Sequence, residues 1–294
     1  MKEIASAEFD AVVSEAGREW VIMSGLERSI FNKISRHKAL KDWDISIYRG
    51  VVTGYNEAFI IDEETKERLI KEDKKSADLI KPLLRGRDID KYIYHNNGLY
   101  LINTHNGIKE KNIPPINIKD YPAIKKHLDK YYKQLEKRQD KGATPYNLRN
   151  CAYLEEFDKI KIAWQRITSE NKFVFSDKGQ YILDSMAFIS GFNSQELAYY
   201  MLCILNSNLI LYWMKNIVHE YGSTGFRLSN QYVEVMPIPE ADSKTKNNIT
   251  KIVDQIITLK KQEKDTTPLE KNIDEIVYSL YGLSDEEVKV VEGK

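Results

Sequence analysis

The sequence has few of the residues that define several large classes of protein. Only two of its 294 residues are cysteines, Cys151 and Cys203, so a disulfide framework and a four-thiolate zinc site are both excluded. The 14 glycines and 8 prolines are too few for a collagen-like or linker-rich chain. Sparse cysteine is typical of a reducing compartment, and we therefore expect a cytoplasmic protein.

Long apolar runs are missing as well. The longest, near residues 199–214, is interrupted by Asn206, Ser207 and Asn208, which makes it a poor membrane span. The amino-terminal residues are too polar for a secretory signal peptide. The sequence therefore predicts no membrane partner.

The common catalytic motifs are also absent. The chain has no G-x-G-x-x-G, no P-loop and no G-x-S-x-G elbow, and its five histidines lack the H-E-x-x-H spacing of a metal site. A nuclease-like Asp73-Lys74-Lys75 falls in a predicted charged helix, where a chance tripeptide is the favoured interpretation. We expect no catalytic residue, no metal and no cofactor in this chain.

Charge is the first informative feature that is present. The whole chain is neutral, with 44 Lys and Arg against 44 Asp and Glu, which excludes a uniformly basic coat for nucleic acid. Residues 71–150 nevertheless carry a net charge of +8, whereas residues 263–294 carry −5. The basic block is either a solvated helix face or a surface that faces phosphates.

The apolar spacing predicts an α+β fold, in which a mixed α/β body is flanked by helices. Residues 1–40 form a helical segment, because Phe9, Val13, Ala16 and Trp20 share one helix face. The body covers residues 41–240. Its strands are expected at 45–51, 58–61, 91–94, 99–102, 159–164, 173–175, 181–183 and 186–189. Its helices are expected at 63–84, 121–139, 194–205 and 208–216, and residues 219–231 are expected to be an exposed loop.

Residues 241–294 form a predicted helical tail. Ile249, Ile252 and Val253 begin a narrow apolar seam that continues to Ile257, and capping patterns at Thr267-Pro268 and Ser284 open two more helices. Such a seam usually packs on another helix. The candidates are the amino-terminal helix of this chain and a helix in a missing part of a larger protein.

Three polar regions combine arginine or lysine with residues that can contact bases. They lie at 83–89, 138–149 and 221–231, and their candidate residues are Arg85, Arg87, Arg138, Lys141, Arg149, Arg227, Asn230 and Gln231. Arginine recognises guanine, and asparagine or glutamine recognises adenine, through paired hydrogen bonds in the major groove. Solvated loops have a similar composition, and for any single residue that interpretation is favoured.

Several motifs, taken in order, resemble one family. They are IYRGVVTGYNEAF at 47–59, LIKPLLRGRDI at 79–89, YPAI at 121–124 with HL at 127–128, RQDKG at 138–142, YNLRNCAY at 146–153, FDKIK at 157–161, LNS at 205–207 and PIP at 237–239. This order resembles the TaqI-like C-terminal specificity domain of type IIG restriction–modification enzymes and related adenine-specific DNA methyltransferases. The resemblance covers roughly residues 40–290.

The resemblance implies that residues 41–240 are a DNA target-recognition domain. In that family the domain follows an adenine-N6 methyltransferase domain, often with a nuclease domain before it, and the methyltransferase flips the target adenine out of the duplex. S-adenosylmethionine and Mg2+ are then implied for the missing catalytic portion, whose Asn-Pro-Pro-Tyr or Asp-Pro-Pro-Tyr tetrapeptide this chain lacks. The implied partners are double-stranded DNA and the methyltransferase domain of the parent chain.

The hypothesis divides phosphate contacts from base contacts. The basic face of helix 121–139 would bind phosphates, the loops at 138–149 and 221–231 would enter the major groove, and the Gly50–Asn56 turn would touch either DNA or the methyltransferase domain. The predicted DNA-binding residues are Arg85, Arg87, Lys126, Lys130, Arg138, Lys141, Arg149, Gln165, Arg166, Lys172, Arg227, Asn230 and Gln231.

The alternative hypothesis is a protein-interaction module that docks a partner through its helical tail and has no DNA readout of its own. Salt concentration distinguishes the two hypotheses, because DNA binding weakens steeply as salt rises, whereas binding through a hydrophobic seam hardly changes.

Overall fold

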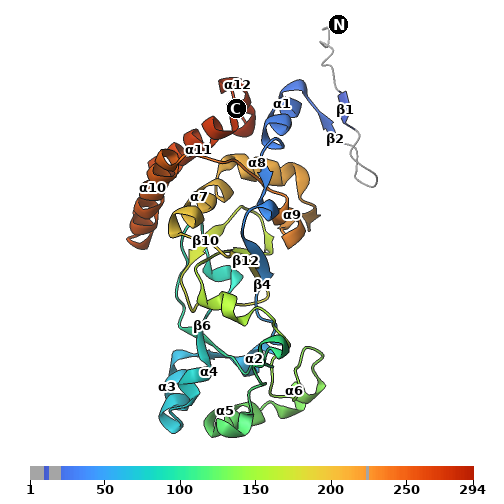
Figure 1. Ribbon diagram of the computed structural model, residues 1–294, viewed down its shortest axis with the longest axis vertical. Helices are drawn as coiled ribbons and strands as arrows, with labels where there is room; N and C mark the ends of the chain where they lie inside the picture. The colour runs from blue at the N-terminus through green and yellow to red at the C-terminus, as the bar shows by residue number, and fades with distance from the viewer. Residues whose placement is uncertain (1–9, 13–20, 223–224) are drawn as a thin grey trace.

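The computed structural model describes residues 10–12, 21–222 and 225–294, and it confirms the predicted α+β class (Figure 1). The helices are α1 (Gly25–Ile34), α2 (Asn56–Phe59), α3 (Glu63–Glu72), α4 (Ser76–Leu79), α5 (Pro122–Asp129), α6 (Tyr132–Lys137), α7 (Gln195–Leu205), α8 (Asn208–Ile217), α9 (Asn230–Glu234), α10 (Ser243–Lys261), α11 (Thr267–Tyr281) and α12 (Asp285–Val291). The strands are β1 (Asp10–Val12), β2 (Val21–Met23), β3 (Lys38–Ala39), β4 (Ser46–Arg49), β5 (Ile60–Asp62), β6 (Ile80–Leu84), β7 (Leu99–Ile102), β8 (Lys161–Gln165), β9 (Ile167–Thr168), β10 (Phe173–Ser176), β11 (Tyr181–Ile182), β12 (Met186–Ser190), β13 (Glu220–Tyr221), β14 (Gly225–Arg227) and β15 (Pro237–Ile238).

A four-stranded antiparallel sheet occupies the middle of the molecule, with strand order β10-β8-β12-β4. Successive residues of its strands point into opposite cores, as the period of two in a strand requires. In β8, Ile162 and Trp164 join one apolar cluster and Ala163 joins the other; in β12, Ala187 joins the first and Phe188 the second. Both faces of this central sheet are therefore buried.

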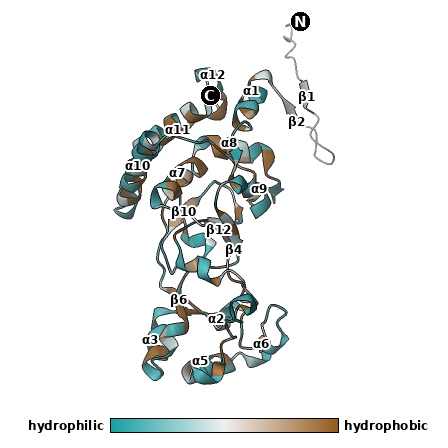
Figure 2. Cartoon of the chain, viewed as in Figure 1, coloured by the Kyte–Doolittle hydropathy of each residue, from teal (hydrophilic) through white to brown (hydrophobic). Residues whose placement is uncertain are grey.

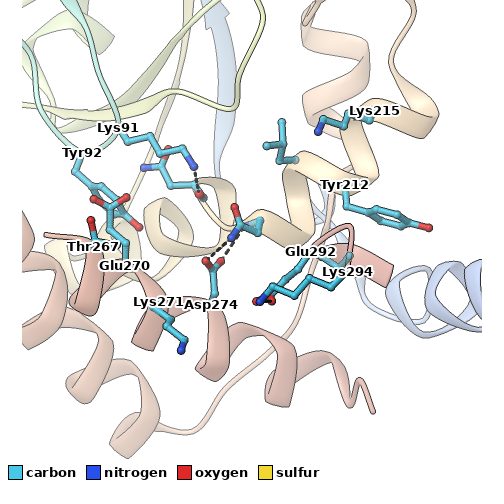
Figure 3. Close-up of a pocket in the computed structure, with 14 residues that line it drawn as sticks. Lys91, Tyr92, Tyr212, Lys215, Thr267, Glu270, Lys271, Asp274, Glu292 and Lys294 are labelled. Atoms are coloured by element: carbon cyan, nitrogen blue, oxygen red, sulfur yellow. Dashed lines mark hydrogen bonds and ion pairs between the residues drawn. The ribbon is translucent and has the colours of Figure 1, made fainter. Parts of the chain in front are cut away.

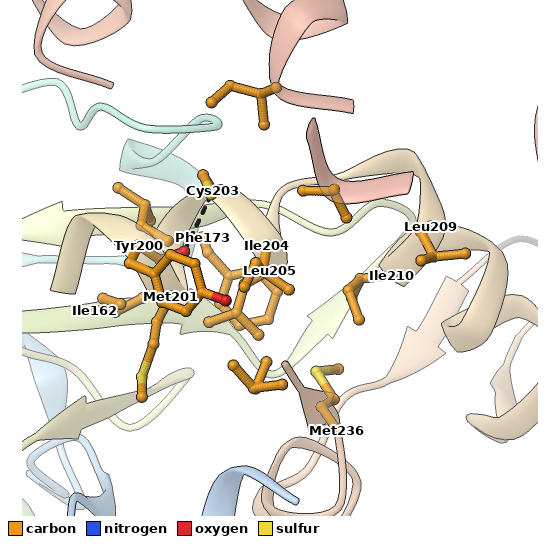
Figure 4. Close-up of a cluster of buried hydrophobic side chains, with 14 of the residues drawn as sticks. Ile162, Phe173, Tyr200, Met201, Cys203, Ile204, Leu205, Leu209, Ile210 and Met236 are labelled. Carbon is orange, nitrogen blue, oxygen red and sulfur yellow. Dashed lines mark hydrogen bonds between the residues drawn. The ribbon is translucent and has the colours of Figure 1, made fainter. Parts of the chain in front are cut away.

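The first cluster, here called the upper core, is built mainly from helices. It joins one face of the central sheet to α1 and to α7–α11, and Figure 4 shows its centre, where Tyr200, Met201 and Leu205 of α7 meet Ile162, Phe173 and Met236. Hydrophobic residues predominate on α7 and hydrophilic residues on α3, in agreement with their buried and peripheral positions (Figure 2). Among the described residues no single helix is long and apolar enough to cross a membrane; only α7 and α8 together pass on length and composition, and they are bent by 60°.

The second cluster, the lower core, packs the other face of the central sheet against the sheet β11-β6-β7-β5 and helices α2–α6. Two sequence expectations are wrong here. Residues 63–84 do not form the single helix predicted for them. They form the short helices α3 and α4 and then strand β6, because Pro82 lacks the backbone N–H that a helix interior needs. The strand predicted at 91–94 forms only isolated bridges, from Tyr92 to Val174 and from Tyr94 to Ile89, and β7 pairs with β5 and β6.

Three further predictions need correction. The helix expected at 121–139 is divided into α5 and α6, and the loop expected at 219–231 contains β13, β14 and α9. The amino-terminal helix expected from Phe9 to Trp20 lies largely outside the described residues, and the described parts, Asp10–Val12 and Val21–Met23, form antiparallel strands.

The tail closes the upper core. Ile249, Ile252, Val253 and Ile256 of α10 are buried, and α10 packs against α7. The seam that the protein-interaction hypothesis required is thus occupied by this chain itself. The amino-terminal helix α1 contacts α12 instead. The boundaries at residues 40 and 240 stay predictions.

Glu287 is the polar link between α1 and α12. Its carboxylate accepts hydrogen bonds from Lys33 (2.6 Å) and Ser29 (2.7 Å) of α1 and from the amide of Ser284 (2.7 Å), which completes the capping box predicted at Ser284. Burial raises the pKa of Glu287, but these hydrogen bonds and the charge of Lys33 outweigh burial and hold the pKa at about 2.

This depressed pKa predicts how stability depends on pH. The contribution of Glu287 is complete above its ordinary pKa of 4.5 and is lost as the pH falls towards 2. Replacing Glu287 with Gln should lower the free energy of unfolding at pH 7 by about 2–3 kcal/mol. It should also flatten the fall in stability between pH 4.5 and 2, measured by urea unfolding. An equal fall in the variant and the wild type would show that the carboxylate is not the group that titrates.

Gly50 leads from strand β4 of the central sheet to Val51 of the lower core. It follows β4 and runs against β11, and a Cβ on Gly50 would lie 2.2 Å from the carbonyl oxygen of Leu183. We expect Gly50→Ala to lower the free energy of unfolding by at least about 2 kcal/mol, because backbone atoms on both sides must move. The control is Gly25→Ala at the start of α1, where nothing lies within 4 Å and the change should stay within about 0.5 kcal/mol.

Candidate nucleic-acid interface

Both faces of the central sheet are buried, so polar side chains of its strands lie at the strand ends. Arg49 ends β4, Gln165 ends β8, and the turn at Asp184–Ser185 leads into β12. In the antiparallel register, Gln165 pairs with Met186 and Arg49 pairs with Ala187. These polar residues therefore lie at one edge of the sheet, which is the edge formed by these strand ends.

Two arginines share one acidic neighbour at this edge. Arg49 forms a 3.0 Å ion pair with the carboxylate of Asp184, and Arg166 donates to the carbonyl oxygen of the same residue at 3.4 Å. Burial is the main cause that lowers the pKa of Arg166, and the positive charges of Arg49 and Arg227 lower it further. Arg166 is thus close enough to Arg49 and to Arg227 for their positive charges to oppose its own.

A small sheet brings Arg227 to this edge. Strand β14 pairs with β9, so that Arg227 lies opposite Ile167, and the Arg227 side chain is exposed. The buried indole of Trp164 in β8 donates a 3.0 Å hydrogen bond to the carbonyl of Leu228. This bond fixes the end of β14 to the central sheet and holds the backbone that carries Arg227 in place.

A hollow of about 480 Å³ adjoins the same strand ends and contains Arg85, Arg87 and Gln165 in its wall. Arg85 is oriented by Asp88, whose carboxylate accepts from its Nε and Nη2 atoms, both at 2.9 Å. Arg87 is exposed. Gly86 lies directly against Gln165, since a Cβ there would come within 2.8 Å of the glutamine Cγ.

We call the residues at these strand ends and around the hollow the arginine strip. It consists of Arg49, Arg85, Arg87, Gln165, Arg166 and Arg227. Five of these six residues are predicted from the sequence, whereas Arg49 and the hollow-lining Asn56 and Ser185 are not. Arg49 ends the alternating strand of a quoted motif, but the pairing of that strand with β12 is a long-range contact that the local pattern does not contain.

Arg138 has a structural role instead. It is buried, and its guanidinium donates to the carbonyl oxygens of Thr53, Pro145 and Asn147 while lying 4.5 Å from the ring of Phe59. Burial lowers its pKa to about 10. Arg138 therefore joins the 51–56 turn to the 144–148 loop, and its side chain is not placed to contact DNA.

The loop that Arg138 supports is itself polar and exposed. Arg149 forms a 2.9 Å ion pair with Asp140, and Lys141 donates to the carbonyl of Glu136. Asp140 packs against Gly54, two residues before Asn56 in the wall of the hollow. The loop therefore lies against the turn that leads to Asn56.

The other predicted DNA-binding residues lie elsewhere. Lys126 of α5 is exposed and 3.5 Å from Glu72 of α3, and Lys130 follows at the end of α5. Lys172 lies between Asp90 and Glu170, at 3.6 and 3.4 Å. Asn230 and Gln231 begin α9, three and four residues after Arg227, with Gln231 exposed and Asn230 half-buried.

A second cavity, of about 640 Å³, lies between the body and the tail (Figure 3). Asp274 of α11 accepts hydrogen bonds from the amide and the side chain of Asn208, each 2.8 Å, and Lys91 donates to the carbonyl of Asn206 at 2.8 Å. Burial is the main cause that raises the pKa of Asp274 to about 6. The two bonds between Asp274 and Asn208 attach the tail to α8. Within residues 10–12, 21–222 and 225–294, no three His, Cys, Asp or Glu side chains cluster as a metal site.

Comparison with known proteins defines the class to which this architecture belongs. The chain is a member of the family described as the TaqI-like C-terminal specificity domain, whose model matches residues 81–238. That region contains the central strands β8, β10 and β12 and every residue of the arginine strip except Arg49.

Individual relatives agree with this assignment. The chain is 28% identical over 251 residues to the type II methyltransferase M.MjaIV of Methanocaldococcus jannaschii, a match that covers 83% of this chain and 80% of that protein. Its fold is similar to that of the type IIL restriction–modification enzyme MmeI, solved in complex with DNA, with a TM-score of 0.62 and 15% identity over 85% of this chain. The type IIG restriction endonuclease BpuSI matches 88% of the chain with a TM-score of 0.50 and 15% identity.

The chain spans 35% of the MmeI chain and 33% of the BpuSI chain. It corresponds in fold to one part of these larger enzymes. Family membership and the restriction–modification relatives identify it as a DNA target-recognition module.

Arg138 and Arg149 offer a matched test of the structural role assigned to Arg138. Arg138→Met should lower the free energy of unfolding by about 3 kcal/mol, because three carbonyl oxygens lose a charged donor. Arg149→Met should change it by less than about 1 kcal/mol, since Arg149 contributes an exposed ion pair. Urea unfolding of both variants measures the difference. Equal stability of the two variants would contradict the role of Arg138.

Proposed function

We propose that the arginine strip is the surface with which this module binds double-stranded DNA and recognises a specific sequence. The observation that supports the proposal is the convergence of five arginines and a glutamine from four separate chain segments at one end of a rigid sheet. Guanidinium groups bind phosphates and also form paired hydrogen bonds with guanine, so one surface can supply both affinity and specificity.

Within the strip, we assign some residues to phosphates and others to bases. Arg49 and Arg166 are held by Asp184 at the sheet edge, and we assign them to phosphates, where a fixed position sets the register of the duplex. Arg87 and Arg227 are exposed and are assigned to base edges, with guanine as the expected base. Gln165, supported by Gly86, is assigned to adenine.

The predicted residues outside the strip extend this proposal. Lys141 and Arg149, on the loop that packs against Gly54, would bind the flanking phosphates, and Lys126, Lys130 and Lys172 would add weaker phosphate contacts wherever the duplex reaches them. Asn230 and Gln231 would contact bases beside the one that Arg227 recognises, because they begin the helix that follows β14.

The parent activity proposed is that of a type IIG restriction–modification enzyme or an adenine-N6 DNA methyltransferase. The relative named as a type II methyltransferase supports a methylating system. S-adenosylmethionine and Mg2+ do not fit the described residues, which contain no cluster of acidic metal ligands, and the sequence has no glycine-rich motif for the cofactor. We assign both groups, and the chemistry they supply, to a methyltransferase or nuclease domain outside this chain.

The test of the strip uses Arg227→Ala, with Lys251→Ala on the exposed side of α10 as the control that removes a charge elsewhere. A preferred duplex is first selected from a random pool. Arg227→Ala should weaken binding to it by about 5- to 150-fold, equivalent to about 1–3 kcal/mol, and should relax the preference at one base pair. Lys251→Ala should change neither.

Binding is measured by fluorescence anisotropy across a range of salt concentrations. The wild-type affinity should fall steeply as salt rises. Binding of the protein releases cations from the DNA phosphates, and this release is less favourable at high salt. Equal losses for Arg227→Ala on preferred and mismatched duplexes would remove the assignment of Arg227 to a base. A salt-independent affinity, or no selected sequence at all, would contradict the proposed function.

A further inference from the structure

The outer face of the small sheet β13-β14-β9 combines arginine with exposed apolar side chains. Arg227 lies opposite Ile167, and Tyr221 lies opposite Gly225. Because side chains two residues apart share a face, Tyr221, Arg227 and Ile167 all project to the same side. Tyr221 is 50% exposed and Ile167 is 45% exposed. The inner face carries Phe226, which packs on the upper core.

This concentration of exposed apolar surface is unusual within the chain. In the part of the chain that the structure describes, the other large apolar side chains with similar exposure are Leu26, Tyr132 and Val235, which belong to α1, α6 and the end of α9. Placing an isoleucine and a tyrosine together on one small sheet favours a partner that covers them.

The neighbouring charges indicate what that partner is. The face is bordered by Arg227 and lies beside Arg166, whose pKa is lowered chiefly by burial and further by the charges of Arg49 and Arg227. A protein partner would need acidic groups in several places to match these guanidiniums, whereas a duplex supplies phosphates at regular spacing along both sides of a groove. The charge pattern therefore favours DNA as the occupant of this face.

Within a DNA duplex, one chemical group matches the two apolar side chains. The major groove is wide enough for a two-stranded β-ribbon, and its apolar feature is the C5 methyl group of thymine. Strands β13 and β14 form such a ribbon, with β9, which carries Ile167, beside β14, and Gly225, the first residue of β14, adds no side chain to keep the backbone away from the base edges. The bond from Trp164 to Leu228 keeps the ribbon attached to the central sheet.

We propose that Ile167 and Tyr221 contact thymine methyl groups in the major groove, on either side of the base pair that Arg227 recognises. The inference rests on the proposed function, because it takes the arginine strip as the DNA-binding surface. It adds that the recognised sequence contains thymine next to the base pair contacted by Arg227, and that van der Waals contact with its methyl group contributes to specificity.

The experiment replaces each thymine of the selected duplex, one at a time, by deoxyuridine, which removes the methyl group and keeps the base pairing. At one or two positions wild-type affinity should fall about three- to fivefold, as expected for one buried methyl group. Ile167→Ala and Tyr221→Ala should weaken binding to the thymine duplex. At the position that each residue contacts, its variant should no longer distinguish thymine from deoxyuridine. Leu26→Ala, an exposed apolar side chain on α1, is the matched control and should behave as the wild type.

Different results would overturn different claims. If deoxyuridine has no effect at any position while Arg227→Ala still weakens binding, the thymine contact is wrong and the proposed function stands. If Ile167→Ala weakens binding equally on thymine and deoxyuridine duplexes, the side chain does not act through the methyl group. If the two alanine variants leave DNA binding unchanged but weaken association with the methyltransferase domain, the face binds protein. If no duplex binds, the proposed function itself fails.

Discussion

The burial of both faces of the central sheet is the constraint on which the rest of the structure depends. Neighbouring residues of β8 and β12 belong to different cores, so no face of either strand is left for a polar site. One end of β8 is closed by Lys161, which is fully buried and donates a 2.9 Å hydrogen bond to the carbonyl of Asp177. The opposite end, at Gln165, opens on the arginine strip. The proposed DNA-binding surface is therefore built on strand ends that lie between the two cores.

The same residue type serves both the fold and the proposed interface, and burial distinguishes the two uses. Arg138 is buried and satisfies three backbone carbonyls, so its charge joins two loops. Arg85 is partly exposed, and two nitrogens of its guanidinium group donate hydrogen bonds to the buried carboxylate of Asp88. Arg227 is exposed at the end of a strand that Trp164 anchors. A list of arginines from the sequence treats these three residues as equivalent, whereas the structure gives each a different burial and a different set of partners.

Much of the secondary structure could be predicted because its signals are local. The predicted strands at 159–164 and 186–189, the helices at 194–205 and 208–216 and the capping box at Ser284 match elements of the structure. The failures concern contacts between distant segments. Nothing in the local pattern shows that β7 pairs with β5 and β6, that the α10 seam packs on α7, or that Arg49 meets Asp184 across the sheet. The resemblance to a known family identified the kind of module, but it could not separate buried from exposed members of the candidate set.

The central claim, that DNA lies across the strand ends of the central sheet, is tested most directly by hydrogen–deuterium exchange of the full chain with and without its preferred duplex. The account predicts slower exchange on binding in segments 165–168, 184–187 and 225–231, and little change in α10 and α11. Protection confined to the tail helices, with the strand ends unchanged, would contradict it.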